Sequence, residues 1–245
     1  MRSGASMSNR LEILEILRTS VQRLEKANHE PGEIVPSGCG GLDTLLEKKG
    51  FERGTLVEWL GTAGSGATML AMLSAQQACV GGGTLAIVDD KRQFYPPAAK
   101  ALGIDLGRTI VLQPQNIQDT SWCLQQILSC PGIAAVMCWP DTIKERMLRR
   151  LQLAAEKGGA LAMLMRPPDA QHHPSWAKVR FFVTAQCSQD TTRRWRVMRL
   201  GSYAQSGQSV ELEIDHETGK LREAGPLPLA AALVPPTPYQ IASRA

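Results

Sequence analysis

TLVEWLGTAGSGATML, residues 55–70, is the stretch of the chain that decides its fold. Thr55–Leu60 is a short apolar run of the kind that forms a buried strand, and the segment from Thr68 onward predicts a helix. The glycine-rich turn between them lies where a phosphate-binding loop, or P-loop, would lie. In such a loop, backbone N–H groups hold phosphate, a lysine contacts the β- and γ-phosphates, and a hydroxyl holds magnesium. The residues that fit this nucleotide-binding pattern are Gly61, Gly64, Gly66 and Thr68.

The loop lacks its lysine, because Ala67 occupies that position. A charge-assisted contact of this type contributes about 1.5–3 kcal/mol to binding, and more where transition-state charge develops. The sequence therefore predicts a degenerate nucleotide site that does not hydrolyse ATP by the usual route. Two interpretations of the glycines stay open: the backbone turn requires them, or they still bind nucleotide.

Apolar runs and helical stretches alternate through the middle of the chain. The runs that predict buried strands are Thr55–Leu60, Thr84–Val88, Thr109–Leu112, Ile133–Cys138 and Ala160–Met165. The segments that predict helices are Thr68–Cys79, Pro96–Leu102, Ser121–Leu128 and Ile143–Lys157. Strands that alternate with helices of this length form βαβ units, in which helices cover both faces of a parallel sheet.

The pattern changes after Pro174. Three further runs predict strands joined by turns, and HETGK (His216–Lys220) predicts the turn that closes a hairpin. We therefore expect an α/β fold with a mainly parallel sheet, flanking helices and antiparallel C-terminal strands. The three predicted C-terminal strands are Val179–Ala185, Arg193–Leu200 and Ser209–Ile214.

The chain divides into three expected segments: a helix within residues 1–30, a core over 31–222, and a flexible Pro/Ala-rich tail over 223–245. The tail is a candidate partner-binding segment. Residues 1–6, MRSGAS, have the character of a cloning remnant and carry no functional argument. An apolar stripe on the N-terminal helix would suit contact with a partner or a second copy, or packing on its own core. The stripe consists of Leu14, Leu17, Val21 and Leu24.

Composition restricts the class of protein. With 43% hydrophobic residues among 245, the chain can bury a core, and its net charge of +4 mildly favours an anionic partner such as nucleic acid. The six cysteines form no CxxC pair, so neither a zinc site nor a disulfide scaffold is expected. No signal peptide and no apolar run of about 18 residues is present, so we expect a cytoplasmic protein without a membrane span.

The order of motifs resembles the ATP-binding core of RecA-type recombinases over roughly residues 30–222. Three stretches carry the resemblance: VPSGCGGLDTLL (35–46), FERGTLVEWLGTAGSGATML (51–70) and LAIVDDKRQFYPPAAKALGIDLGRTIVLQP (85–114). The implied fold is a RecA-like P-loop NTPase core. Within this likeness, RWRVMRL (194–200) and GQSVELEIDHETGKL (207–221) are similar to the ImuA family. ImuA proteins are RecA-like and are encoded beside ImuB, a Y-family-like protein, and an error-prone DNA polymerase in bacterial damage-response operons.

Departures from the RecA pattern indicate that catalysis is lost. Where the resemblance implies a glutamate that activates water, this chain has Lys91, after Asp89 and Asp90. The strand that should end in a magnesium-assisting aspartate ends instead at Cys138 or Trp139, and Asp141 lies beyond a proline. We therefore expect no catalytic residues, no enzyme activity and no cofactor. Asp89 and Asp90 are interpreted as a structural strand end rather than a metal pair.

Basic and aromatic residues outside the P-loop are candidates for DNA binding. Two loops that would correspond to RecA's DNA-binding loops are short here, PDTIKERM and RPPDAQHHPSWAK. An alternative interpretation of Trp176 is that it caps the core. The basic runs could equally form a solvated surface. The paired histidines are not expected to bind metal. The candidates are Arg146, Arg149, Arg150, Arg166, Trp176, Lys178, Arg194 and Arg196, with Arg193 and Arg199 on the same strand as the last two.

The resemblance implies a non-catalytic accessory protein of SOS-induced, error-prone translesion DNA synthesis. Its expected partners are an ImuB-type protein, RecA, the error-prone polymerase and DNA, with self-association through the N-terminal helix. Two rival hypotheses stay open. One is an unconventional DNA-dependent ATPase that uses a lysine such as Lys91, and the other is a cell-division inhibitor of the SulA type.

Overall fold

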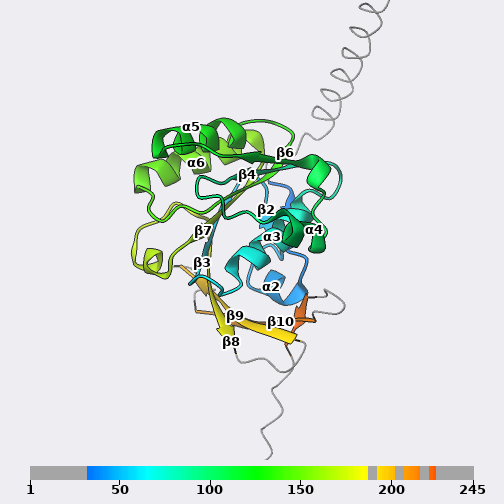
Figure 1. Ribbon diagram of the computed structural model, residues 1–245. Helices are drawn as coiled ribbons and strands as arrows, with labels where there is room; N and C mark the ends of the chain where they lie inside the picture. The colour runs from blue at the N-terminus through cyan, green and yellow to red at the C-terminus, as the bar shows by residue number, and fades with distance from the viewer. Residues whose placement is uncertain (1–31, 187–191, 202–206, 216–220, 225–245) are drawn as a thin grey trace, which may run out of the picture.

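The computed structural model describes residues 32–186, 192–201, 207–215 and 221–224 (Figure 1). In these ranges nine strands form one sheet in the order β11–β10–β9–β8–β3–β7–β6–β4–β5. The strands are β3 (Leu56–Leu60), β4 (Thr84–Val88), β5 (Thr109–Leu112), β6 (Ile133–Cys138), β7 (Leu161–Arg166), β8 (Val179–Gln186), β9 (Thr192–Leu200), β10 (Ser209–Asp215) and β11 (Leu221–Glu223).

The sheet changes from parallel to antiparallel pairing at β8, the sixth of its strands in chain order. Strands β5, β4, β6, β7, β3 and β8 are parallel neighbours, whereas β8 to β9, β9 to β10 and β10 to β11 are antiparallel pairs. Short connections after β8 permit antiparallel pairing, while β3, β4, β5 and β6 are each followed by an α-helix that returns the chain to the same edge. The expected α/β fold is confirmed.

Helices cover the two faces of the sheet separately. Side chains that alternate along each strand divide the core, with Trp59 and Met163 packing on one side and Leu56 and Leu164 on the other. The helices α2 (Gly40–Thr44), α3 (Ala67–Ala78) and α4 (Pro96–Ala101) pack on the first side, and α5 (Ile117–Leu128) and α6 (Glu145–Gly158) pack on the second. Figure 1 shows α5 and α6 side by side at the top, with the antiparallel strands at the bottom.

Local sequence explains the helix ends. Helix α5 begins one turn before the predicted Ser121, because the Asn116 side chain accepts a 2.9 Å hydrogen bond from the Asp119 N–H. Helix α6 ends at Gly158 and is capped by Gly159, whose φ of 76° is left-handed. A Cβ at Gly158 would overlap the Leu128 carbonyl oxygen, so a glycine there lets the ends of α5 and α6 approach closely.

Several short elements were not predicted. They are β1 (Ile34–Val35) and β2 (Phe51–Glu52), which form an antiparallel pair, α2, β11, and the 3-10 turns η1 (Leu106–Arg108) and η2 (Pro168–His172). Strand β7 ends at Arg166, one residue beyond the predicted end. The apolar stripe at Leu14, Leu17, Val21 and Leu24, the HETGK turn and the tail from residue 225 lie outside the described residues. Within the described ranges, every helix is too short or too polar to cross a bilayer.

Candidate functional site

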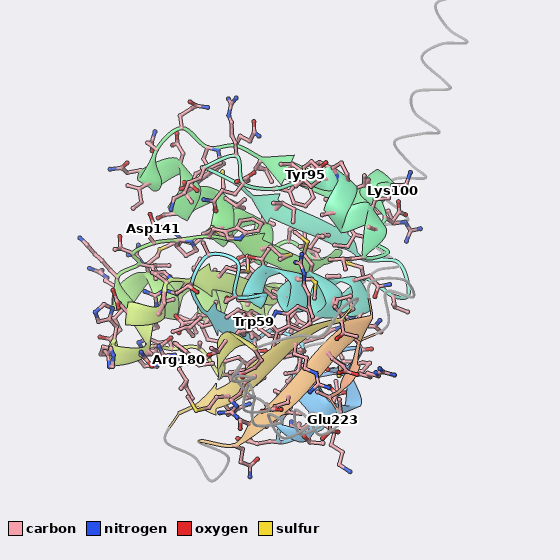
Figure 2. The ribbon with its side chains drawn as sticks, turned by 60° about the horizontal axis from the view of Figure 1, so that its bottom comes forward. Trp59, Tyr95, Lys100, Asp141, Arg180 and Glu223 are labelled. Carbon is pink, nitrogen blue, oxygen red and sulfur yellow. The ribbon has the colours of Figure 1, made fainter. Side chains whose placement is uncertain are left out.

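A cleft of about 710 Å³ lies at the carboxyl end of β3, where the P-loop, residues 61–68, joins α3. We call it the P-loop cleft. Its walls come from the loop itself, from the segments that follow β6 and β7, and from the start of β9. Trp59, Tyr95 and Asp141, labelled in Figure 2, are three of its lining residues and come from three different segments. The four predicted nucleotide-binding residues therefore lie together in one concave site.

Backbone conformation and steric contacts explain why glycine occupies positions in the P-loop. Gly64 has a φ of 79° and Gly66, at the N-terminus of α3, has a φ of 92°. A Cβ at Gly66 would also overlap the indole of Trp195, which reaches the loop from β9. Gly61 donates its N–H to the Arg166 carbonyl oxygen over 3.2 Å, which fixes the start of the loop on β7. The turn thus requires at least Gly66 whether or not a ligand binds.

The hydroxyl of Thr68 is engaged by a tryptophan. The indole N–H of Trp139, the residue after β6, donates a 3.1 Å hydrogen bond to Thr68 Oγ1. In a functional P-loop, the hydroxyl at this position holds magnesium and the strand equivalent to β6 supplies an assisting carboxylate. Here the hydroxyl accepts a hydrogen bond from an indole N–H, and a tryptophan rather than a carboxylate follows β6.

The acidic residues near the cleft are committed to other contacts. Both carboxylate oxygens of the buried Asp89 accept backbone N–H groups, from Gln93 over 2.7 Å and from Phe94 over 2.9 Å. This contact favours the structural interpretation of the strand end. Lys91 forms an ion pair with Asp141. Among the described residues, no three His, Cys, Asp or Glu side chains are grouped so that they could bind a metal ion.

The structure corrects the expected position of Arg166, a predicted DNA contact. Arg166 is the last residue of β7 rather than part of the following loop, and its side chain is only 2% exposed. Its guanidinium donates to the fully buried Glu58 over 2.6 Å, and Arg180 donates to the other oxygen of the same carboxylate over 2.7 Å. Arg166 is therefore the partner of a buried carboxylate and is not part of an exposed basic surface.

The basic patch predicted on β9 is neutralised by β10. Arg194 pairs with Glu213 over 2.8 Å and Arg196 pairs with Glu211 over 2.9 Å, because the antiparallel register places each arginine opposite a glutamate. Arg199 is on the opposite face, is buried, and donates to backbone carbonyl oxygens. The interpretation of these arginines as a free basic surface is therefore corrected.

A second set of candidates does come together. The guanidinium of Arg149, on the exposed face of α6, lies 4.4 Å from the ring centroid of Trp176, and the Trp176 indole N–H donates to Glu145 over 3.1 Å. Trp176 is 43% exposed, so it does not cap the core. Arg146 and Arg150 are exposed on the same helix. Lys178 is held separately, in an ion pair of 2.6 Å that lowers the pKa of Glu52 through its hydrogen bond.

Sequence analysis did not place Trp195 or Arg193 at the P-loop cleft. Both residues reach the cleft from β9, more than 120 residues after the loop. Sequence analysis also gave no role to Glu58, although a charged residue in the middle of the apolar strand Leu56–Leu60 must have a buried partner. The Trp139–Thr68 contact joins segments 71 residues apart and left no local signal.

Comparison with known proteins identifies the family. A model of the RecA N-terminal domain matches residues 11–138, which is just over half of the chain. The chain belongs to the RecA N-terminal domain family. It is similar to Protein RecA of Streptomyces avermitilis, with 38% identity over 97 residues, and to Protein RecA of Nocardioides sp., with 39% identity over 97 residues. These matches cover 40% of this chain and 26% and 28% of the relatives.

The matched stretch of this chain therefore covers about a quarter of the length of these RecA proteins. The RecA N-terminal domain match includes the P-loop and Lys91 and stops at Cys138, one residue before Trp139. The Arg149–Trp176 pair lies beyond it.

Proposed function

We propose that this RecA-related protein is a non-catalytic accessory factor of error-prone translesion DNA synthesis that binds DNA and a protein partner of the ImuB or RecA type. The observation that carries the non-catalytic part is the 3.1 Å hydrogen bond from Trp139 to Thr68. It supports the proposal because the hydroxyl that would hold magnesium already accepts a hydrogen bond from a bulky donor.

Charge at the cleft supports the same proposal. Phosphoryl transfer needs a metal ion and cations placed on the transferring phosphate, together with a group that orients the attacking water. This chain has Ala67 in place of the lysine, and Lys91 where the RecA pattern has a carboxylate. Lys91 is moreover paired with Asp141, which argues against its use as a replacement for the missing P-loop lysine.

DNA binding is supported best by the Arg149–Trp176 pair. An exposed aromatic ring next to a guanidinium provides a flat face for an unstacked base and a cation for its phosphate. Arg146 and Arg150 extend the positive charge along α6. The hydrogen bond from Trp176 to Glu145 fixes the ring, so little side-chain freedom is lost when a base stacks on it.

Turnover of ATP separates this proposal from an unconventional ATPase. The purified full chain is incubated with Mg-ATP, with and without single-stranded DNA, and phosphate release is compared with that of a Thr68→Ala variant. We expect both proteins to remain at the background rate. Turnover by the full chain that disappears in Thr68→Ala would sink the non-catalytic proposal.

A capture experiment tests the proposed binding of a protein partner. An ImuB-type protein and RecA are each presented to the immobilised full chain and to a chain that ends at Glu223. Capture of either protein by the full chain is expected, and the truncated chain tests whether the tail contributes. Capture of the tubulin-like division protein, with neither expected partner bound, would favour a SulA-like role instead.

A further inference from the structure

A second, smaller pocket lies at the amino ends of β4 and β5, whereas the P-loop cleft lies at the carboxyl end of β3. We call it the β4–β5 pocket. Its volume is about 170 Å³, and its apolar lining includes the buried Leu85 and Ile104 and the half-buried Cys79. An apolar cavity of about 150 Å³ accepts a group of the size of benzene, so this pocket has room for one aliphatic side chain.

Exposed apolar side chains surround the mouth of the β4–β5 pocket. Val80 lines the pocket and is 62% exposed, and Leu106, which is next in sequence to the pocket residue Asp105, is 37% exposed. Asp105 and Arg108 form an exposed ion pair of 3.8 Å beside them. An apolar centre with a polar rim is the usual composition of a surface that packs against another element.

The described part of the chain begins close to this pocket. The N–H of Gly32 donates to the Arg53 carbonyl oxygen over 3.3 Å, and the Arg53 guanidinium donates to the Ala78 carbonyl oxygen over 2.9 Å. Ala78 is the last residue of α3, and the pocket residues Cys79 and Val80 follow it. The length of one arginine side chain therefore separates the segment that holds Gly32 from the edge of the pocket.

The predicted N-terminal helix needs a surface for its apolar stripe. A helix of this size owes most of its stability in water to the packing of its apolar face. Seven residues, 25–31, separate the last stripe residue, Leu24, from Gly32. Extended, they reach about 25 Å, which is longer than the arginine side chain that joins the Gly32 segment to the end of α3.

The short tether favours contact within one chain over contact between copies. It holds the stripe beside its own pocket at an effective concentration of the order of millimolar. A second copy would compete equally for the same pocket only at a chain concentration in that range. Below it, the stripe of the same chain is the favoured occupant.

We propose that the N-terminal helix packs on the core of its own chain, with Leu24 in the β4–β5 pocket and the rest of the stripe over Val80 and Leu106. The stripe is then covered within the monomer and is not offered to a second copy. The inference goes beyond the proposed accessory role and does not depend on it. Partner capture and this contact are measured separately, so either can fail without the other.

Disulfide trapping in the full chain tests the contact. In a Leu24→Cys variant, a mild oxidant should join the thiol at position 24 to Cys79 of the pocket. A disulfide needs the two Cα atoms within about 7 Å, so it reports entry of residue 24 into the pocket. We expect the product to run as a monomer on a non-reducing gel, and peptide mass spectrometry should identify the link between positions 24 and 79.

Gln22→Cys is the matched control. Position 22 has nearly the same tether, but two residues along a helix lie about 200° apart, so its side chain points away from the pocket. It should be joined to Cys79 much more slowly than the thiol in Leu24→Cys. The exposed Cys130 is an internal competitor, because a segment that met the surface at random would react with this thiol before the half-buried Cys79.

A charge at Val80 tests the surface around the pocket. In the Leu24→Cys chain, Val80→Asp should slow disulfide formation by about tenfold or more, the effect of losing the burial of one apolar side chain. Leu153→Asp, at an exposed position of α6 on the other side of the sheet, should leave the rate within about twofold. If Val80→Asp does not fold, Val21→Ser, which interrupts the stripe itself, gives the same answer.

Three results would overturn the inference. A disulfide between two chains would assign the stripe to a second copy. Equal rates in Leu24→Cys and Gln22→Cys, or capture of Cys130 in place of Cys79, would indicate random collision. An unchanged rate in both Val80→Asp and Val21→Ser would show that the stripe does not pack on this surface.

Discussion

Trp139 donates its indole N–H to the Thr68 hydroxyl over 3.1 Å, so the end of β6 and the start of α3 are joined across the P-loop cleft. Thr68 has the place of the hydroxyl that holds magnesium in a working P-loop, and the assisting carboxylate would be expected at Cys138 or Trp139. In this chain a contact between two side chains joins these two segments. The loss of the lysine at position 67 is only one part of a wider change.

Replacing the missing lysine alone is therefore expected to fail. In an Ala67→Lys variant, Thr68 still accepts the Trp139 N–H and Lys91 remains in place of an acidic group. We expect phosphate release from Mg-ATP to stay at background, with circular dichroism confirming that the variant is folded. Measurable turnover in Ala67→Lys would mean that the lysine is the single missing element.

A Trp176→Ala change is expected to weaken binding of single-stranded DNA by about thirtyfold, the middle of the range for one stacked base. Arg149→Gln should reduce the slope of log affinity against log salt by about one, as for one lost phosphate contact. Fluorescence anisotropy with a labelled oligonucleotide over a salt series measures both effects.

Trp122→Ala is the control for Trp176→Ala, because Trp122 is exposed on α5 and lies outside the stack with Arg149. If all three variants bind like the parent chain, the Arg149–Trp176 pair is not a DNA contact.

Removal of the Glu58 charge should destabilise the fold strongly. Glu58→Gln leaves Arg166 and Arg180 without their buried carboxylate, and breaking a buried ion pair in this way costs about 3–5 kcal/mol. Urea denaturation followed by circular dichroism measures the loss. Glu211→Gln removes a carboxylate from the exposed pair with Arg196, so its expected cost is about 0–1 kcal/mol. Equal effects of the two changes would show that burial of the Glu58 cluster contributes nothing.

The free energy of unfolding should fall with increasing pH above pH 9 because of Cys138. Burial raises the pKa of this thiol from 9.0 to about 12, and the nearby Asp90 carboxylate raises it further. The contribution of the Cys138 thiol to the free energy of unfolding is fully present below pH 9, because the folded and the unfolded chain both keep the thiol proton there. Between pH 9 and about 12 the unfolded chain releases the proton and the folded chain does not, so stability is lost.

Cys138→Ala should reduce the steepness of this loss between pH 9 and 10.5, by up to one proton per chain, in urea midpoints measured at each pH. The exposed Cys130, changed to Ala, is the comparison and should leave the slope unchanged. An unchanged slope in Cys138→Ala would contradict the prediction.

Sequence patterns predicted the parallel half of the sheet almost residue by residue. Buried strands such as Thr84–Val88 and Ile133–Cys138 are apolar runs, and the turn residues on either side mark where each strand begins and ends. Short elements such as α2 and β11 were missed, because they are held by packing on the sheet rather than by local sequence.

The candidate site was less accessible from sequence. The absent lysine and the cation at Lys91 were visible, because they are single positions in a known order of elements. Arg166 was misplaced because an error of one residue at the end of β7 moves a side chain from a buried ion pair to a loop. The pairing of Arg194 with Glu213 depends on strand register, which composition does not determine.

The ion pair between Lys91 and Asp141 joins the segment after β4 to the segment after β6, beside the contact from Trp139 to Thr68. Two crosslinks of this kind hold neighbouring walls of the cleft in one arrangement. On the proposed function, the protein therefore cannot use ATP hydrolysis to release a bound partner. Its complexes would end by competition, dilution or proteolysis, so the duration of a mutagenic episode would follow the abundance of the chain in the cell.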